Sequence, residues 1–147
     1  MIKDSGERRS FDTGAVRDIQ EGKGRCDLMP LEVVHKLLSS DGVIHCISLF
    51  KHTGDTQALY NALWHFMDKN YRDPQTMLLE VSKHFEEGAL KYGDNNWQKG
   101  IPVDCYMDSA IRHYLKYRRG DNDEDHARAF VWNIMCCIWE VDCHDKD

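Results

Sequence analysis

The feature that most constrains the fold is a helical apolar pattern between two strong boundary signals. Apolar side chains recur every three or four residues, at Leu78, Val81, Phe85, Ala89 and Tyr92. Asp73-Pro74 suits a helix start, because aspartate caps the first turn and proline fits into it. Gly93 suits a helix stop, because glycine adopts positive φ without strain. The spacing therefore predicts an amphipathic helix that ends at Gly93.

Similar signals predict further helices on both sides of this one. Pro30 and Asp55 each precede an apolar helical pattern, and Asp104 is expected to cap a helix that ends at Gly120. The acidic residues 121–125 favour a last helix from His126, where the helix macrodipole attracts negative charge. No alternating run is long enough for a substantial strand. The sequence predicts an all-α fold of four to six helices.

The N-terminal residues differ from the rest of the chain. Residues 1–29 contain four glycines and mixed charges but no apolar stripe, which is typical of an extended arm. A chain of 147 residues has the length of one domain. We therefore predict a single all-α domain over 1–147, with an arm at 1–29, a variable helical segment at 30–72 and motif-bearing helices at 73–141.

Charge and hydropathy exclude several classes of protein. No apolar run reaches the 18 or so residues of a membrane span, and the N-terminus lacks the apolar core of a signal peptide, so we expect a cytoplasmic protein without a membrane partner. The net charge is −6, and residues 120–147 hold eight acidic against two basic side chains. This distribution argues against DNA or RNA as a partner, but it is compatible with a small anion bound by a few cations.

The cysteines predict neither a disulfide nor a metal site. None of the six has CxxC spacing, and Cys143-His144 is the only pairing that resembles metal ligands. Two ligands do not complete a tetrahedral site. We expect reduced, mostly buried thiols, no metal ligands and no cofactor.

The segment GALKYGDNNWQKGIP, residues 88–102, is the densest local candidate for a ligand site. Asn95 and Asn96 offer amide donors and acceptors, and Trp97 or Phe85 could stack on a purine. The alternative is structural. Phe85 is in register with the apolar face of its helix, so it could be a core residue. Trp97 could simply fill the loop without contacting a ligand.

Two basic segments leave similar alternatives open. Arg112 and His113, on the polar side of the 104–119 helix, could contact phosphate, or Arg112 could simply pair with Asp108 on a solvated face. In the arm, Arg17, Lys23 and Arg25 lie among glycines without Walker A spacing. That segment could cradle an anion or wrap a neighbouring subunit.

The carboxylates give a weak magnesium site. Glu80, Glu86 and Glu87 lie on one helix, but a two-metal phosphohydrolase needs acids that converge from a second helix. The helix from His126 offers His126 and Asn133 at the corresponding positions instead. A hydrolase would have to use those glutamates with Asp108 or Asp125.

Four ordered motifs resemble a known family: GAVRDIQEGKGRCDLMP, EEGALKYGDNNWQKGIP, DSAIRHYLKYRRGDNDEDH and AFVWNIMCCIW. They are similar to phage proteins labelled dATP/dGTP diphosphohydrolase-like, relatives of the all-α MazG pyrophosphohydrolases. The resemblance is strongest to the branch of Thoeris anti-defence proteins of the first type. It covers residues 8–29 and 80–140.

The resemblance implies a ligand and two sets of residues. Members of that branch bind cyclic ADP-ribose isomers made by TIR proteins and hold them uncleaved, and some also take up cyclic di- and trinucleotides of the CBASS system at a second site. By position, Phe85, Asn95 and Arg112 resemble the residues that stack on and clamp cyclic ADP-ribose. Asn96, Trp97 and His113 complete the predicted set. The second set comprises Arg17, Lys23, Gly24 and Arg25.

The resemblance leaves two main functions, a nucleotide sponge and a dNTP pyrophosphohydrolase, and the residues favour the sponge. Because the acids for a magnesium cage are few, we expect a non-catalytic nucleotide sponge that acts in the cytoplasm of an infected bacterium. The resemblance also implies a homo-oligomer, a dimer or a trimer of dimers. The alternative is a Mg²⁺-dependent dNTP pyrophosphohydrolase, and an oligomeric phage structural protein is a third possibility.

Overall fold

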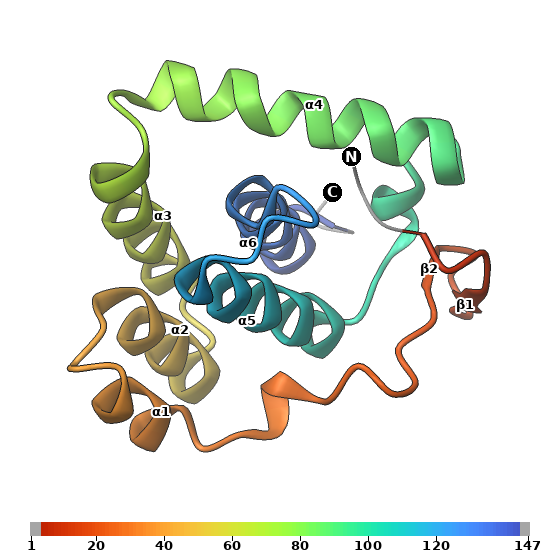
Figure 1. Cartoon of the computed structure of the whole chain (residues 1–147). Coiled ribbons are helices and arrows are strands. Elements are labelled where there is room, and N and C mark those ends of the chain that lie inside the picture. The colour runs from red at the N-terminus through yellow and green to blue at the C-terminus, as the bar shows by residue number, and fades with distance from the viewer. Residues whose placement is uncertain (1–3, 145–147) are drawn as a thin grey trace. The chain divides into compact units, whose positions relative to one another are not determined.

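A computed structural model describes residues 4–144, which fold mainly as helices (Figure 1). The all-α class is confirmed: this range contains six α-helices, and its one sheet is a hairpin of two three-residue strands. The elements in chain order are β1 (Arg8–Ser10), β2 (Val16–Asp18), the 3₁₀ turn η1 (Cys26–Leu28), α1 (Leu31–Leu37), α2 (Gly42–Thr53), α3 (Gln57–Asn70), α4 (Pro74–Tyr92), the 3₁₀ turn η2 (Asn96–Lys99), α5 (Val103–Arg119) and α6 (His126–Asp142). No helix within residues 4–144 is both long enough and apolar enough to cross a membrane.

The chain divides into two units, with one boundary within η1 and the other within α4. The first unit contains the described residues up to Asp27 and those from Glu80 onward, and the second unit is Leu28–Leu79. The whole of the segment expected at 30–72 therefore belongs to the second unit. The single domain expected over 1–147 stays a prediction.

The second unit is built on α2. This helix packs against α1 and α3, and its buried face includes Ile44, Ile47 and Phe50. Phe66 of α3 is 1% exposed in the same unit. Asp41 caps α2 by accepting the N–H of Ile44 at 2.9 Å. This is an ordinary apolar core with a capped helix.

In the first unit, α5 and α6 pack against each other (Figure 1). Ile111 of α5 and Phe130 and Ile134 of α6 are fully buried, as the apolar pattern predicted. Asp125 caps α6 by accepting the N–H of Arg128 at 2.9 Å. Gly120 follows α5 with φ of +87°, a conformation that favours glycine.

One predicted helix start is wrong. Asp104 was expected to cap α5, but α5 begins at Val103 and Pro102 occupies the cap position. Proline has no N–H to satisfy and its φ of −56° suits a helix entry. Asp104 instead lies in the first turn, where its charge is still favourable next to the helix N-terminus.

The arm packs on its own chain within the first unit. Asn96 donates its side-chain N–H to the carbonyl of Val16 at 2.8 Å and accepts the N–H of Val16 at 2.9 Å. The Cys26 N–H donates to Asp108 at 2.7 Å, and Thr13 donates to the carbonyl of Gly100. The arm is thus fixed at several points along its length, and β2 lies beside the loop that follows α4.

Candidate functional site

A pocket of about 810 Å³ lies entirely within the first unit. Its walls come from the arm, the second half of α4, the following loop, α5 and α6. Eight of the ten residues singled out from the sequence line it: Arg17, Lys23, Phe85, Asn95, Asn96, Trp97, Arg112 and His113. The motifs predict two separate sites for these residues, whereas the structure brings them into one pocket.

Gly24 and Arg25 are absent from the pocket lining. Arg25 forms a bidentate ion pair with Asp27, at 2.7 and 2.8 Å, and lies 3.8 Å from Asp104. The carbonyl of Gly24 accepts a hydrogen bond from Arg112 at 2.7 Å. Their role at a second nucleotide site stays a prediction.

Aromatic rings form one side of the pocket. The Phe85 ring lies 5.7 Å from that of Trp97, edge to face, and 5.9 Å from that of Trp132. Phe85 is half-buried, so it is packed against both tryptophans and still reaches the pocket surface. The two interpretations of Phe85, core and stacking surface, are therefore compatible in this geometry.

The two asparagines after α4 differ in availability. Asn96 is buried, and both polar ends of its amide are bonded to the backbone of Val16. It positions β2 and has little hydrogen-bonding capacity left for a ligand. Asn95 is exposed, adopts the left-handed conformation with φ of 59°, and makes no side-chain capping bond to η2. Of the pair, Asn95 is the better candidate for a ligand contact.

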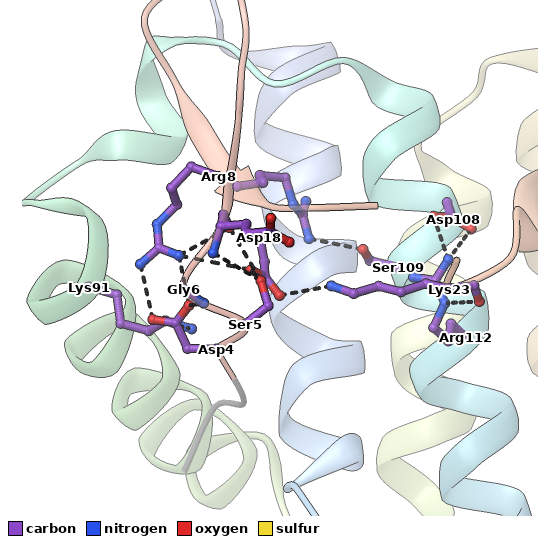
Figure 2. A network of polar contacts seen from close by, with 12 residues as sticks. Asp4, Ser5, Gly6, Arg8, Asp18, Lys23, Lys91, Asp108, Ser109 and Arg112 are labelled. Atoms are coloured by element: carbon purple, nitrogen blue, oxygen red, sulfur yellow. Dashed lines mark hydrogen bonds and ion pairs between the residues drawn. The ribbon is translucent and has the colours of Figure 1, made fainter. Parts of the chain in front are cut away.

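Arg112 is held by the protein itself. Its Nη2 lies 2.6 and 2.7 Å from the two carboxylate oxygens of Asp108, and the pair is drawn in Figure 2. Its Nε also donates to the carbonyl of Lys23 at 3.3 Å. Only 12% of the Arg112 side chain and 3% of the Asp108 side chain are exposed. The ion pair is thus a partly buried anchor for the arm rather than part of a solvated face.

The arm contributes a second polar network, which Figure 2 shows beside the Asp108–Arg112 pair. Asp18 accepts from Ser5 and from Lys23, at 2.5 and 2.9 Å. Asp4 accepts from Arg8 at 2.7 Å, and the ammonium of Lys91 lies 3.8 Å away. The hydrogen bond from Arg8, together with the N–H of Gly6, lowers the pKa of Asp4. Lys23 therefore reaches the pocket already paired with a carboxylate.

Arg17 is different, because it is a cation without an anion. Its Nη2 donates to two neutral acceptors, Ser109 at 3.0 Å and Asn133 at 3.2 Å. Its guanidinium carbon lies 5.5 Å from the ring centre of Tyr106 and 5.8 Å from that of Trp132. Burial lowers the pKa of Arg17. Among the described residues no carboxylate forms an ion pair with it.

Several buried nitrogen atoms on the pocket lining lack a protein partner. They are Nε of Arg9, Nη1 of Arg17 and Nε1 of Trp132, together with Nδ1 of His84. The arginine and tryptophan N–H groups only donate hydrogen bonds. A buried donor without an acceptor costs about 1–3 kcal/mol. Three residues that line the pocket thus each carry a buried donor without an acceptor in the protein.

Two histidines, one in α5 and one at the start of α6, contact each other. Nδ1 of His113 lies 2.9 Å from Nδ1 of His126, and Nε2 of His126 lies 2.7 Å from a carboxylate oxygen of Asp123. Burial and the neighbouring His126 lower the pKa of His113 well below its ordinary value. His113 is therefore a neutral imidazole at pH 7, which makes it a weak phosphate clamp.

The carboxylates of the hydrolase alternative have other partners. Glu80 pairs with Lys83 at 3.2 Å, Glu87 pairs with Arg128 at 2.9 Å, and Asp125 caps α6. Within residues 4–144, the His, Cys, Asp and Glu groups close enough to share a metal ion include none of Glu80, Glu86, Glu87, Asp108 or Asp125.

Sequence reasoning missed part of the pocket, notably His84, Trp132 and Asn133. All three lie on helices. The apolar spacing of those helices does not distinguish a pocket residue from an ordinary core or surface residue. The signal that could have identified Asn133 is its polarity: it is 2% exposed inside α6, a position that normally requires a buried partner. Its amide N–H donates to the carbonyl of Ala129, and its amide oxygen accepts from Arg17, which lies 116 residues earlier.

The helices and pocket define a class of protein: an α-helical protein whose pocket combines arginine donors with aromatic walls. The family model for dATP/dGTP diphosphohydrolase, N-terminal, matches residues 51–147, and the chain belongs to that family. The MazG-like relationship expected from the motifs is thereby supported. No curated protein and no solved structure matches the chain. The family match leaves out the arm, which supplies Arg9, Arg17 and Lys23 to the pocket.

Proposed function

We propose that this protein binds a cyclic ADP-ribose isomer in the pocket of its first unit and holds it without cleavage. The observation that carries the proposal is Arg17, a pocket cation with no carboxylate partner and one unpartnered buried Nη. A desolvated charge without a counter-ion is unfavourable in the empty protein. A diphosphate supplies both the missing charge and the missing acceptors, through charge-assisted hydrogen bonds.

The remaining lining fits the other parts of such a ligand. Phe85 and Trp97 offer ring surfaces for a base, and stacking of this kind contributes about 1–3 kcal/mol per base. Asn95 offers an amide beside them. A volume of about 810 Å³ falls within the range of about 300–1,000 Å³ typical of small-molecule sites. The same wall could thus hold an adenine while Arg17 holds the phosphates.

The placement of the acids supports binding rather than cleavage. Magnesium-dependent phosphoryl chemistry needs carboxylates that converge on the metal ions. Here Glu87 is bound to Arg128, and Asp108 is bound to Arg112 and to the backbone of Cys26. Both carboxylates are thus used to hold the structure together.

The second candidate function is the one in the family description, a dATP or dGTP diphosphohydrolase. It predicts that either dNTP disappears in the presence of Mg²⁺. Glu80, Glu86 or Glu87 would supply metal ligands together with Asp108 or Asp125, and Glu80 and Glu87 would first have to leave the ion pairs described above.

The decisive experiment is capture and release. The protein is incubated with a TIR-made cyclic ADP-ribose isomer, the unbound ligand is removed, and the protein is heat-denatured. We expect the supernatant to contain intact ligand in stoichiometric amount. Products in place of the ligand, or pyrophosphate released from dGTP or dATP with Mg²⁺, would refute the non-catalytic proposal.

Variants locate the site. Phe85→Ala combined with Asn95→Ala is expected to weaken capture at least 100-fold, because it removes a stacking surface and an amide contact. Arg25→Gln is the matched control, since Arg25 is an arm cation outside the pocket lining. Circular dichroism confirms that each variant is folded. Unfolding of the double variant would show that Phe85 is only a core residue, and an equal loss in the control would show that capture does not depend on this pocket.

The same preparation tests the second nucleotide site. Cyclic di- and trinucleotides are titrated into the wild type and into Arg25→Gln. If Gly24 and Arg25 form a site of their own, the variant loses oligonucleotide binding and keeps cyclic ADP-ribose capture. The ligand would have to compete with Asp27, which holds Arg25 at 2.7 Å.

A further inference from the structure

Three potential metal ligands meet where α5 and α6 are joined. They are His113 of α5, Glu124 of the connecting turn, and His126, the first residue of α6. One donor atom from each lies within 4.8 Å of the other two. His126 is 2% exposed and His113 and Glu124 are half-buried. This group is separate from the glutamates of α4 that a magnesium hydrolase would use.

The orientation of His126 is the second observation. Its Nε2 is bonded to the carboxylate of Asp123 at 2.7 Å, so its Nδ1 faces His113. A carboxylate that holds the outer nitrogen of a histidine fixes the ring and its tautomer, and this arrangement accompanies most metal-bound histidines. The inner nitrogen is then free of a proton and directed toward His113.

The distance between the histidines is close to that of a metal site. Nδ1 of His113 and Nδ1 of His126 are 2.9 Å apart. A tetrahedral Zn²⁺ with bonds of about 2.0–2.1 Å separates two nitrogen ligands by about 3.4 Å. An opening of about half an ångström, within reach of a side-chain torsion, would admit the ion.

We propose that His113, Glu124 and His126 bind a divalent transition metal ion of the Zn²⁺ type. Two imidazoles and one carboxylate suit Zn²⁺ and related ions, whereas Mg²⁺ and Ca²⁺ prefer oxygen ligands. His113 and Glu124 also line the pocket, so the ion would lie at the pocket wall. The ion would add a positive centre to the pocket without requiring the glutamates of α4.

A competing grouping combines His126 with Asp121 and Asp123. Asp121 is already held by Arg119 through two contacts, at 2.5 and 2.8 Å. Asp123 contacts the opposite nitrogen of His126, which suits it to the supporting role. We therefore assign the metal to the side that faces His113.

The test uses the full chain and the metal alone. The protein is stripped with a chelator and titrated with Zn²⁺ by calorimetry, and Co²⁺ serves as the spectroscopic probe. We expect one ion per chain, and d–d bands of a four-coordinate site without thiolate charge transfer. His113→Gln and Glu124→Gln are each expected to weaken binding at least 10-fold, and Asp123→Asn about 10- to 100-fold.

The control is a second histidine pair. The rings of His35 and His45 are 5.0 Å apart, close to the 5.2 Å between His113 and His126, but neither belongs to a three-ligand group in the described chain. His45→Gln should leave Zn²⁺ affinity unchanged. Glu124→Gln is the safest probe, since it is half-buried and neutralises one ligand without changing its size.

Four outcomes would overturn the assignment. They are no Zn²⁺ binding by the wild type, full affinity in both His113→Gln and Glu124→Gln, a thiolate charge-transfer band that points to the cysteines, and a loss in Asp121→Asn as large as that in Glu124→Gln. None of these results depends on whether a nucleotide binds, so this test and the capture experiment fail independently.

Discussion

The two units differ in how many polar side chains they bury. In the second unit, the buried polar side chains among the described residues are Asp41, which caps α2, and Ser48. In the first unit they are Asp27, His84, Asn96, Asp108, His126, Arg128 and Asn133. Buried polar groups need partners and contribute less to stability than a well-packed apolar core. The first unit therefore contains most of the buried polar side chains, and the pocket lies among them. The second unit is mainly an apolar core.

The largest expected effect tests the apolar side of this comparison. Phe66→Ala removes a ring that is 1% exposed, and we expect it to lower the free energy of unfolding by about 3–5 kcal/mol. Leu37→Ala, at a position that is 78% exposed, should change it by less than about 0.5 kcal/mol. Urea unfolding at 25 °C measures both. Similar values for the two variants would contradict the core described for the second unit.

The next prediction concerns pH and the polar side. Burial and the nearby Arg128 lower the pKa of His84 from 6.5 to about 4. The unfolded chain therefore binds the proton more readily between these values, and stability falls as the pH drops from 6.5 toward 4. The full shift corresponds to about 3 kcal/mol. Above pH 6.5 this histidine contributes no pH dependence.

His84→Gln should flatten that part of the stability curve. Trp64→Phe is a suitable background, because the remaining tryptophans, Trp97, Trp132 and Trp139, then report on the first unit. His52→Gln in the second unit controls for the loss of an imidazole. An unchanged slope between pH 4 and 6.5 in His84→Gln would disprove the prediction.

The smallest expected effect on stability is also the sharpest test of function. Arg17→Met removes the hydrogen bonds to Ser109 and Asn133, but it also removes a desolvated charge without an ion pair. Because these effects oppose each other, we expect the free energy of unfolding to change by no more than about 1 kcal/mol. Nucleotide capture should fall about 10- to 150-fold, because a charge-assisted bond contributes about 1.5–3 kcal/mol. Arg17→Lys keeps the charge but loses the planar fork, and should give an intermediate loss. A destabilisation of several kcal/mol with unchanged capture would make Arg17 a structural residue.

Helix boundaries followed from local sequence because their causes are local. Asp73 accepts the N–H of Thr76 at 2.6 Å, and Gly93 directly follows α4 with φ of +90°. The predicted cap at Asp104 is wrong because sequence identifies a capping residue only by its type. Pro102, two positions earlier, is also a start signal, and it occupies the cap position. Errors of this size are expected wherever two start signals adjoin.

The pocket could be predicted only in part. Phe85, Asn95 and Arg112 were found through a resemblance of motifs, and all three line it. Arg17 was assigned elsewhere, because nothing in the sequence shows that the arm folds back onto α5 and α6. The bonds that place it connect residues 92 and 116 positions apart. Periodicity and capping describe neighbours along the chain, so contacts of this separation leave no local signal.

The two hydrogen bonds between Asn96 and Val16 have a consequence for the order in which the chain folds during synthesis. Its two partners are separated by 80 residues, and Arg17 finds Asn133 only after α6 exists. The arm therefore leaves the ribosome before the helices on which it docks, and closure of so long a loop is entropically slow. We expect the arm to dock last, after α5 and α6 have packed. The pocket would then be completed in a single late step, and a nascent chain that stops before α6 would have no binding site at all.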